Sequence, residues 1–262
     1  MRFEEKPCRL LQRPTGLPEN EAFCLDLART CGLPCAESGL DFRRDGVLFV
    51  VKRWDRRPRQ GRMERIHQED MCQVLGLRPE SKYQESGDYG GLPALFEAAC
   101  RHGIKGPGGT DPAMFLARAA VFSWLAGNCD AHAGNFAVLH GPEGPQFAPL
   151  YDIVCTRVYS NLTTELAMSI GGASDAQAVC EEDFVQLAGE LELDPECMLA
   201  EAHRQKEALR RRLAARPASG MGAEVARFVE ERCADVDCWQ DPRPRAERSR
   251  PCGHPSSGPK LP

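Results

Sequence analysis

The sequence predicts an α+β fold that is mostly helical. Apolar residues recur at helical spacing over much of the chain between residues 17 and 233. Two pairs of short apolar runs are separated by glycine-containing turns, which are typical of β-hairpins. Of the 262 residues, 42% are hydrophobic and 27% are charged, so the chain can bury a core and has the composition of a globular protein.

The first predicted element is a helix that begins at Leu17. Pro18 suits the first turn of a helix, and the side chain of Asn20 can cap the helix. Apolar residues then follow at helical spacing as far as Gly32-Leu33-Pro34. Glycine and proline at this point should end the helix.

Two hairpins are predicted from turn sequences between apolar runs. The first joins strands at residues 37–42 and 47–51 through a turn that contains Asp45-Gly46. Asp-Gly between two apolar runs is the strongest short hairpin signal. The second hairpin joins residues 136–139 and 146–150 through the sequence Gly-Pro-Glu-Gly. Both pairs should therefore be antiparallel.

The remaining periodic segments are predicted to be helices. They cover residues 66–75, 92–101 and 112–126, and two or three further helices follow between residues 181 and 233. The helix at 112–126 has a wide apolar face and should be buried. Because the chain beyond residue 238 is rich in proline, arginine, serine and glycine, we expect residues 239–262 to form a disordered tail.

Charge and hydropathy disfavour several classes of protein. No run of about 18 apolar residues is present, so we expect no membrane span. The first residues lack the apolar stretch of a secretory signal, so we expect a cytoplasmic protein. The net charge of −5 argues against broad affinity for nucleic acids. The basic segment at residues 204–212 also carries Glu207, and we interpret it as a solvated helix face.

The chain contains 13 cysteines. An odd number, in a chain that we expect to stay in the cytoplasm, favours reduced and mostly buried thiols over a disulfide framework. Cys233, Cys238, Cys252 and His254 lie near one another in the sequence, but their spacing matches no common zinc site. A zinc-binding or redox protein is therefore the weakest of the alternatives.

The most informative segment is an acidic loop that contains Asp130. Asn135 follows five residues later, and Asp152 follows the second predicted hairpin. This is the spacing of a protein-kinase active site. Asp130 would accept the proton of a substrate hydroxyl, while Asn135 and Asp152 would supply oxygen ligands to Mg²⁺. The hairpin between these two ligands would bring them to the same end of the site.

Four segments in this order resemble the HipA family of bacterial serine/threonine kinases, which are the toxins of toxin–antitoxin (HipBA-type) modules. The segments are residues 17–21, 67–73, 128–139 and 147–152. The resemblance implies a protein-kinase-like C-terminal lobe at residues 56–238, preceded at residues 1–55 by a remnant of the small N-terminal lobe, with its hairpin, and the hinge. It also implies ATP and Mg²⁺ as cofactors, a protein Ser or Thr hydroxyl as the acceptor, and a HipB-like helix-turn-helix antitoxin as a partner. DNA would be contacted only indirectly, through that antitoxin.

The resemblance also implies roles for individual residues near the acidic loop. Asp130 matches the family's catalytic base. Asn135 and Asp152 match its magnesium ligands. The positions that match its contacts to ATP in this region are His132, Ala133, Gly134, Asn135, Tyr151 and Asp152.

Further site residues are implied nearer the N-terminus. Lys52, Arg53 and Trp54 match the linker that meets adenine, where Trp54 would pack on the base and the backbone near Lys52 would form hydrogen bonds. Lys6 stands where the family carries its phosphate-pairing lysine, and Glu21 would be its ion-pair partner. The alternatives are a core position for Trp54 and a solvated chain end for Lys6.

The chain also departs from the family pattern. Gly134 stands where the family usually has a lysine, and Lys52 where an acidic residue is common. Only five residues precede Lys6, where the family has a β-rich region with a phosphate-covering loop. We therefore interpret the chain as N-terminally truncated. Two hypotheses stay open: an active kinase, alone or with a separately encoded N-lobe, and an impaired pseudokinase that binds an antitoxin or that lobe.

Overall fold

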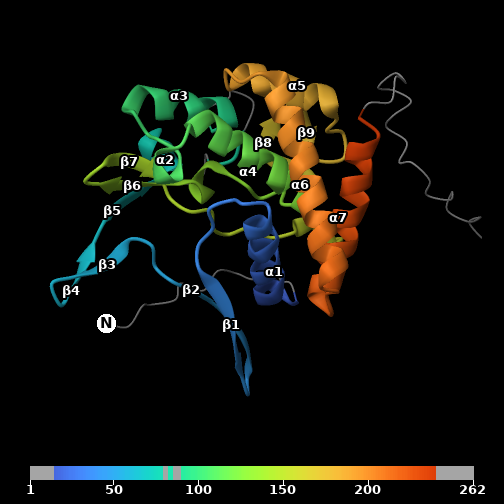
Figure 1. Ribbon diagram of the computed structural model, residues 1–262, viewed down its shortest axis with the longest axis horizontal. Coiled ribbons are helices and arrows are strands. Elements are labelled where there is room, and N and C mark those ends of the chain that lie inside the picture. Colours follow the sequence, from blue (N-terminus) through green and yellow to red (C-terminus); the bar gives the residue numbers. More distant parts are fainter. Residues whose placement is uncertain (1–14, 79–81, 85–89, 240–262) are drawn as a thin grey trace, which may run out of the picture.

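A computed structural model describes residues 15–78, 82–84 and 90–239 of the chain (Figure 1). The helices are α1 (Leu17–Thr30), α2 (Met71–Val74), α3 (Leu92–His102), α4 (Pro112–Ala126), α5 (Glu181–Glu190), α6 (Pro195–Ala215) and α7 (Met221–Asp237). Three 3₁₀ helices are η2 (Pro107–Gly109), η3 (Ala133–Asn135) and η4 (Thr156–Val158). The strands are β1 (Ser38–Arg43), β2 (Gly46–Val51), β3 (Arg56–Arg59), β4 (Arg62–Arg65), β5 (His67–Asp70), β6 (Ala137–Gly141), β7 (Gly144–Phe147), β8 (Glu165–Ile170) and β9 (Ala173–Asp175). The expectation of a mostly helical α+β fold is confirmed.

Helix α4 lies at the centre of the helical body, as its wide apolar face predicts. Eleven of its 15 residues are buried, and it packs against α3, α6 and α7 (Figure 1). The ring of Trp124 on this helix contacts Phe184 and Trp239, with ring centroids 5.5 and 5.6 Å apart. Trp239 is 6% exposed, so the core reaches one residue beyond the boundary that we drew at 238. Residues 240–262 of the expected tail lie outside the described residues.

The strands of the described ranges all pair antiparallel. They form three two-stranded pairs, β1–β2, β3–β4 and β8–β9, and one three-stranded sheet in the order β5-β6-β7. Both hairpins that the sequence predicts are therefore confirmed. The β1–β2 hairpin extends away from the helical body (Figure 1), and Phe42 near its turn is 74% exposed.

Two predictions about local structure are wrong. The helix expected at 66–75 is instead strand β5 followed by the short helix α2, because β5 pairs with β6 from a distant part of the chain. Asp70 then starts α2 through a capping box with Gln73. Asn20 does not cap α1, because Gly16 occupies the N-cap position. Asn20 is completely buried, and its side chain binds the backbone of Cys155.

The interpretation of residues 204–212 as a solvated face is correct for the exposed Arg204 and Arg211 and wrong for the buried Lys206. Arg204 pairs with Glu201 of the same helix at 2.6 Å. Lys206 is buried and pairs with Asp237 of α7 at 2.8 Å. The pair between Lys206 and Asp237 connects α6 to α7. None of the helices in the described part of the chain is long and apolar enough to cross a membrane.

Candidate active site

The loop between α4 and β6 is folded tightly around Asp130. Helix α4 ends at Gly127, whose positive φ of 72° is readily adopted only by glycine. The side-chain oxygen of Asn128 accepts a hydrogen bond from the backbone N–H of Asp130 at 3.0 Å. The carbonyl of Asp130 accepts two more, from the backbone N–H of His132 at 2.9 Å and from Nδ2 of Asn135 at 3.0 Å. The main chain at Asp130 is therefore fixed without using its carboxylate.

The segment after β7 brings Asp152 to the same place. The hydroxyl of Tyr151 donates a hydrogen bond to the carbonyl of Gly134 at 2.9 Å, which ties this segment to the Asp130 loop. Asp152 has a φ of 54°, a left-handed conformation that is uncommon for residues other than glycine. Burial and the charge of Asp130 both raise the pKa of Asp152. The two carboxylates therefore lie close enough to repel each other.

A third carboxylate, that of Glu21, comes from α1. Burial raises the pKa of Glu21 to about 7, the charge of Asp152 adds to this rise, and a hydrogen bond from the backbone of Asp152 partly opposes it. We expected Glu21 to pair with Lys6, which lies outside the described residues. In the described part of the chain, Glu21 instead adjoins Asp152 and adds to the negative charge of the site.

These residues fit a magnesium ion. Asn135 uses its amide nitrogen to bind the Asp130 carbonyl, so its amide oxygen is the atom that it can offer to a ligand. Carboxylate and amide oxygens are the donors that Mg²⁺ prefers. Glu21 is half-buried and Asp152 is exposed, yet both carboxylates have raised pKa values, and a divalent cation would relieve the repulsion that contributes to those shifts.

The raised pKa of Glu21 gives a testable pH dependence. A carboxyl whose pKa is 4.5 when unfolded and about 7 when folded binds its proton more tightly in the folded state. The free energy of unfolding should therefore fall as pH rises from about 4.5 to about 7, and Glu21 should add no further loss above pH 7. Because Glu21 is partly exposed, its effect on stability is smaller than the full pKa shift would give. Over this pH range we expect the Glu21→Gln variant to lose about 1 kcal/mol less free energy of unfolding than the wild type.

Urea unfolding at pH 5 and pH 8 measures this effect. Glu97→Gln, a change of an exposed glutamate on α3, is the matched control. We expect Glu21→Gln to be more stable than the wild type at pH 8 and similar at pH 5. The assignment would be wrong if both variants followed the wild-type pH profile.

Lys82 is a site residue that sequence analysis missed. Its Nζ lies 2.9 Å from Nε2 of His132, which is 7% exposed. Burial, and then the charge of Lys82, lower the pKa of His132, although Asp130 and Asp152 act in the opposite direction. The ammonium of Lys82 can only donate, so in this contact Nε2 of His132 accepts the hydrogen bond and the ring carries its proton on Nδ1. No sequence motif marks Lys82, which lies in a polar, turn-rich segment.

The geometry around His132 explains why glycine stands at position 134. A side chain at Gly134 would place its Cβ 3.2 Å from Cε1 of His132, which is a tight contact. Glycine therefore suits this position, where the family usually has a lysine. Lys82 supplies a cation from another segment, and its charge lowers the pKa of both His132 and Asp152. The site thus holds a positive charge despite Gly134.

Of the linker residues, Trp54 contacts the site, whereas the side chain of Lys52 is paired with another residue. The ring of Trp54 stacks on Tyr151, with centroids 5.0 Å apart, and is half-buried, so Trp54 lies at the site beside Asp152. The side chain of Lys52 pairs with Glu37 at 2.9 Å, and its backbone N–H donates to the Glu37 carbonyl.

Arg53, the next linker residue, also forms an ion pair with a nearby side chain. Its guanidinium pairs with the buried carboxylate of Asp55 at 2.6 Å. Burial of Asp55 explains this pairing, because a buried charge needs a partner. Of the three linker side chains, only Trp54 therefore contacts Tyr151 of the acidic site in the part of the chain that the structure describes.

Two bacterial proteins share part of the sequence. The chain is 40% identical over 162 residues to a Sinorhizobium fredii protein named "Putative kinase Y4mE", a match that covers 62% of this chain and 38% of that protein. It is 30% identical over 174 residues to the serine/threonine-protein kinase toxin HipA of Shewanella oneidensis, covering 61% of this chain and 39% of the toxin. The chain thus spans less than half the length of either relative.

Solved structures show the same fold. HipA in the Shewanella oneidensis complex of HipA, HipB and operator DNA matches with a TM-score of 0.73 at 23% identity, covering 88% of this chain and 59% of that one. The Helicobacter pylori proinflammatory kinase CtkA matches with a TM-score of 0.53 at 15% identity, covering 90% and 88% of the two chains. The architecture is therefore an α+β, kinase-like fold. The family model described as HipA-like C-terminal domain matches residues 5–215, and the chain belongs to that family.

Proposed function

We propose that this chain carries the catalytic region of a HipA-like serine/threonine protein kinase, which transfers the γ-phosphoryl group of ATP to a protein hydroxyl. The observation that carries the proposal is the 2.9 Å hydrogen bond from the Tyr151 hydroxyl to the Gly134 carbonyl, which holds the segment of Asp152 against the loop of Asp130. Asp130 comes from the loop before the β6–β7 hairpin and Asp152 from the segment after it. A relative with the name of a serine/threonine-protein kinase supports the choice of acceptor.

Each residue would have a distinct role in this reaction. Asp130 would accept the proton of the attacking hydroxyl. Asp152 and the amide oxygen of Asn135 would hold Mg²⁺, with Glu21 adding negative charge beside them. ATP·Mg²⁺, when bound, supplies the phosphoryl group and offsets the charge that develops on it.

His132 and Lys82 would contribute to nucleotide binding. Nδ1 of His132 is buried and has no hydrogen-bond partner among the described residues. A buried donor without a partner is costly, so it marks a place where a bound oxygen would be stabilised. Lys82 would fix the ring through Nε2 and add a positive charge near the phosphates. Trp54, stacked on Tyr151, would offer its exposed face to the adenine ring.

We further propose a helix-turn-helix antitoxin of the HipB kind as the partner, with DNA contacted through it. The name of one relative, a HipA toxin, and the HipA–HipB–DNA complex among the solved structures support this part of the proposal. The ion pairs of Arg204 with Glu201 and of Lys206 with Asp237 are consistent with an indirect contact to DNA, because these two positive charges already have acidic partners.

Calorimetric titration with ATP tests the nucleotide site. We expect binding that requires Mg²⁺, and we expect Asp152→Asn to weaken it by about 10- to 100-fold because a metal ligand is lost. Asp175→Asn, at the end of β9, is the control and should bind like the wild type. Equal binding by wild type and Asp152→Asn would contradict the proposal. Wild-type binding without any phosphoryl transfer would favour the pseudokinase alternative.

A further inference from the structure

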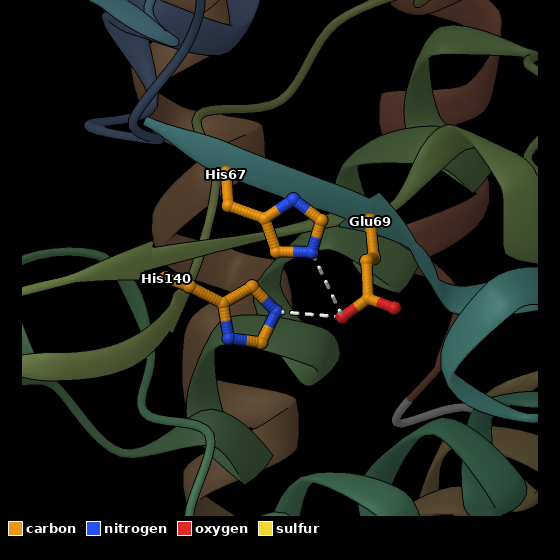
Figure 2. A group of neighbouring side chains, drawn as sticks. All are labelled: His67, Glu69 and His140. Carbon is orange, nitrogen blue, oxygen red and sulfur yellow. Dashed lines mark ion pairs between the residues drawn. The ribbon is translucent and has the colours of Figure 1, made fainter. Parts of the chain in front are cut away.

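Three side chains of types that can ligate a metal ion converge on one face of the β5–β6 pair (Figure 2). His67 on β5 lies directly opposite His140 on β6 in the antiparallel register, and Glu69 lies two residues after His67. Side chains alternate along a strand, so His67 and Glu69 share one face with His140. The intervening residue, Gln68, should point the other way, and its side chain indeed accepts a hydrogen bond from Nε1 of Trp54 at 2.8 Å.

The distances suit a single bound ion. Oε2 of Glu69 lies 2.8 Å from Nε2 of His140 and 3.8 Å from Nε2 of His67. All three potential ligand atoms lie within 4.8 Å of one another. An ion held at about 2.0–2.1 Å by each atom of a tetrahedral site places ligand atoms about 3.3 Å apart. Small rotations of the two rings would reach this spacing, because the His67 side chain is 67% exposed and that of His140 is 38% exposed.

A hydrogen-bonded ion pair accounts for only part of this arrangement, because the 3.8 Å from Oε2 of Glu69 to Nε2 of His67 is too long for a hydrogen bond. Glu69 can accept hydrogen bonds from both rings only if each histidine presents an N–H at Nε2. A metal ion would bind the same three atoms with both rings neutral and the carboxylate ionised. The rings are tilted against each other, with centroids 5.1 Å apart, and in Figure 2 both turn a nitrogen toward the same carboxylate oxygen. Three potential ligand atoms that converge in this way can chelate one ion after small ring rotations.

We propose that His67, Glu69 and His140 bind a divalent transition-metal ion such as Zn²⁺, with water in the remaining position. Two imidazoles and one carboxylate favour Zn²⁺ and its neighbours over Mg²⁺, which prefers oxygen ligands alone. The site is thus chemically different from the acidic site around Asp152. It does not depend on the proposed kinase activity.

An ion bound by these three residues would affect the stability of strands β5 and β6. It would join β5 to β6, and one residue separates β6 from η3, which contains Asn135. On the opposite face of β5, Gln68 binds Trp54, whose ring stacks on Tyr151. A bound ion would therefore stabilise the pair of strands that supports both sides of the acidic site, and it should raise the melting temperature.

Titration with Co²⁺, followed by absorption spectroscopy and thermal unfolding, tests the proposal. Co²⁺ is a useful probe because thiolate ligands give it strong charge-transfer bands, and all 11 cysteines of the described ranges are free thiols. We expect one Co²⁺ ion per chain without thiolate bands, together with a rise in melting temperature. The variant His67→Ala/His140→Ala should lose this binding, and Glu69→Gln should weaken it by at least about 10- to 100-fold.

His102→Ala, which changes an exposed histidine at the end of α3, is the matched control and should bind like the wild type. The ligand side chains are partly or largely exposed, so each variant should melt at nearly the wild-type temperature without metal. Unchanged Co²⁺ binding in the double variant would overturn the proposal. Thiolate bands in the wild-type spectrum would overturn it as well, because they would assign the ion to cysteines.

Discussion

Replacing Asp130 with asparagine is expected to slow phosphoryl transfer by about 10²- to 10⁴-fold, the usual contribution of a general base. An amide cannot accept the proton of the attacking hydroxyl. The loop should keep its conformation, because Asn128 and His132 bind only the main chain of Asp130. Removing this charge should also lower the pKa of Asp152, which Asp130 raises. Binding of ATP·Mg²⁺ should therefore be preserved while transfer is lost.

Transfer of labelled phosphate from ATP to serine- and threonine-containing peptides measures this effect. Asp45→Asn, in the exposed turn between β1 and β2, is a matched control that removes the same charge far from the acidic loop. It should transfer phosphate at the wild-type rate. Equal rates for wild type and Asp130→Asn would show that the transfer does not depend on this loop.

Helices were predictable from the sequence where local signals were sufficient. Helix α4 begins after the cap Asp111 and ends at Gly127, and its apolar residues point to a buried position. Helix α3 likewise ends at Gly103, which has a positive φ of 64°. Both hairpins of the prediction have glycine in or next to the turn. In each case the information lies within a few residues of the element, so no knowledge of distant contacts is required.

Strands that depend on distant partners were not predictable in the same way. Residues 66–75 contain apolar side chains at helical spacing, but the pairing of β5 with β6, about 70 residues later in the chain, makes the first half a strand. Strands β3 and β4 have the sequences RRPR and RMER, which lack the alternation of a half-buried strand. Tertiary contacts decide the structure of such segments, and a single sequence does not reveal them.

In the acidic site, too, some residues were predictable from local spacing, whereas others depend on contacts between distant segments. Asp130, Asn135 and Asp152 lie on either side of one hairpin, so their grouping follows from local spacing. Lys82 reaches His132 across 50 residues without any motif. The prediction for Glu21 identified the residue but paired it with Lys6, whereas the structure describes its contact with Asp152. The roles assigned to these residues stay predictions until activity is measured.

Replacing Asn20 with leucine is expected to lower the free energy of unfolding by about 2–4 kcal/mol, because two buried backbone groups lose their partners. Oδ1 of Asn20 accepts from the N–H of Cys155 at 2.8 Å, and Nδ2 donates to the carbonyl of Cys155 at 3.0 Å. Leucine has the same branched shape as asparagine, although it is larger, and it can form neither bond. The segment that begins at Asp152 would lose its attachment to α1, so ATP·Mg²⁺ should also bind more weakly.

Urea unfolding and ATP titration of the same samples measure both effects. Thr30→Ala, at the exposed end of α1, is the matched control and should change the free energy of unfolding by less than about 0.5 kcal/mol. Asn20→Asp would keep the acceptor for Cys155 N–H but would bury a charge beside its carbonyl, so it should be unstable too. If Asn20→Leu were as stable as Thr30→Ala, the contact between α1 and Cys155 would not hold Asp152 in place. In that case the left-handed conformation of Asp152 would have to be maintained by Tyr151 and its bond to the Gly134 carbonyl.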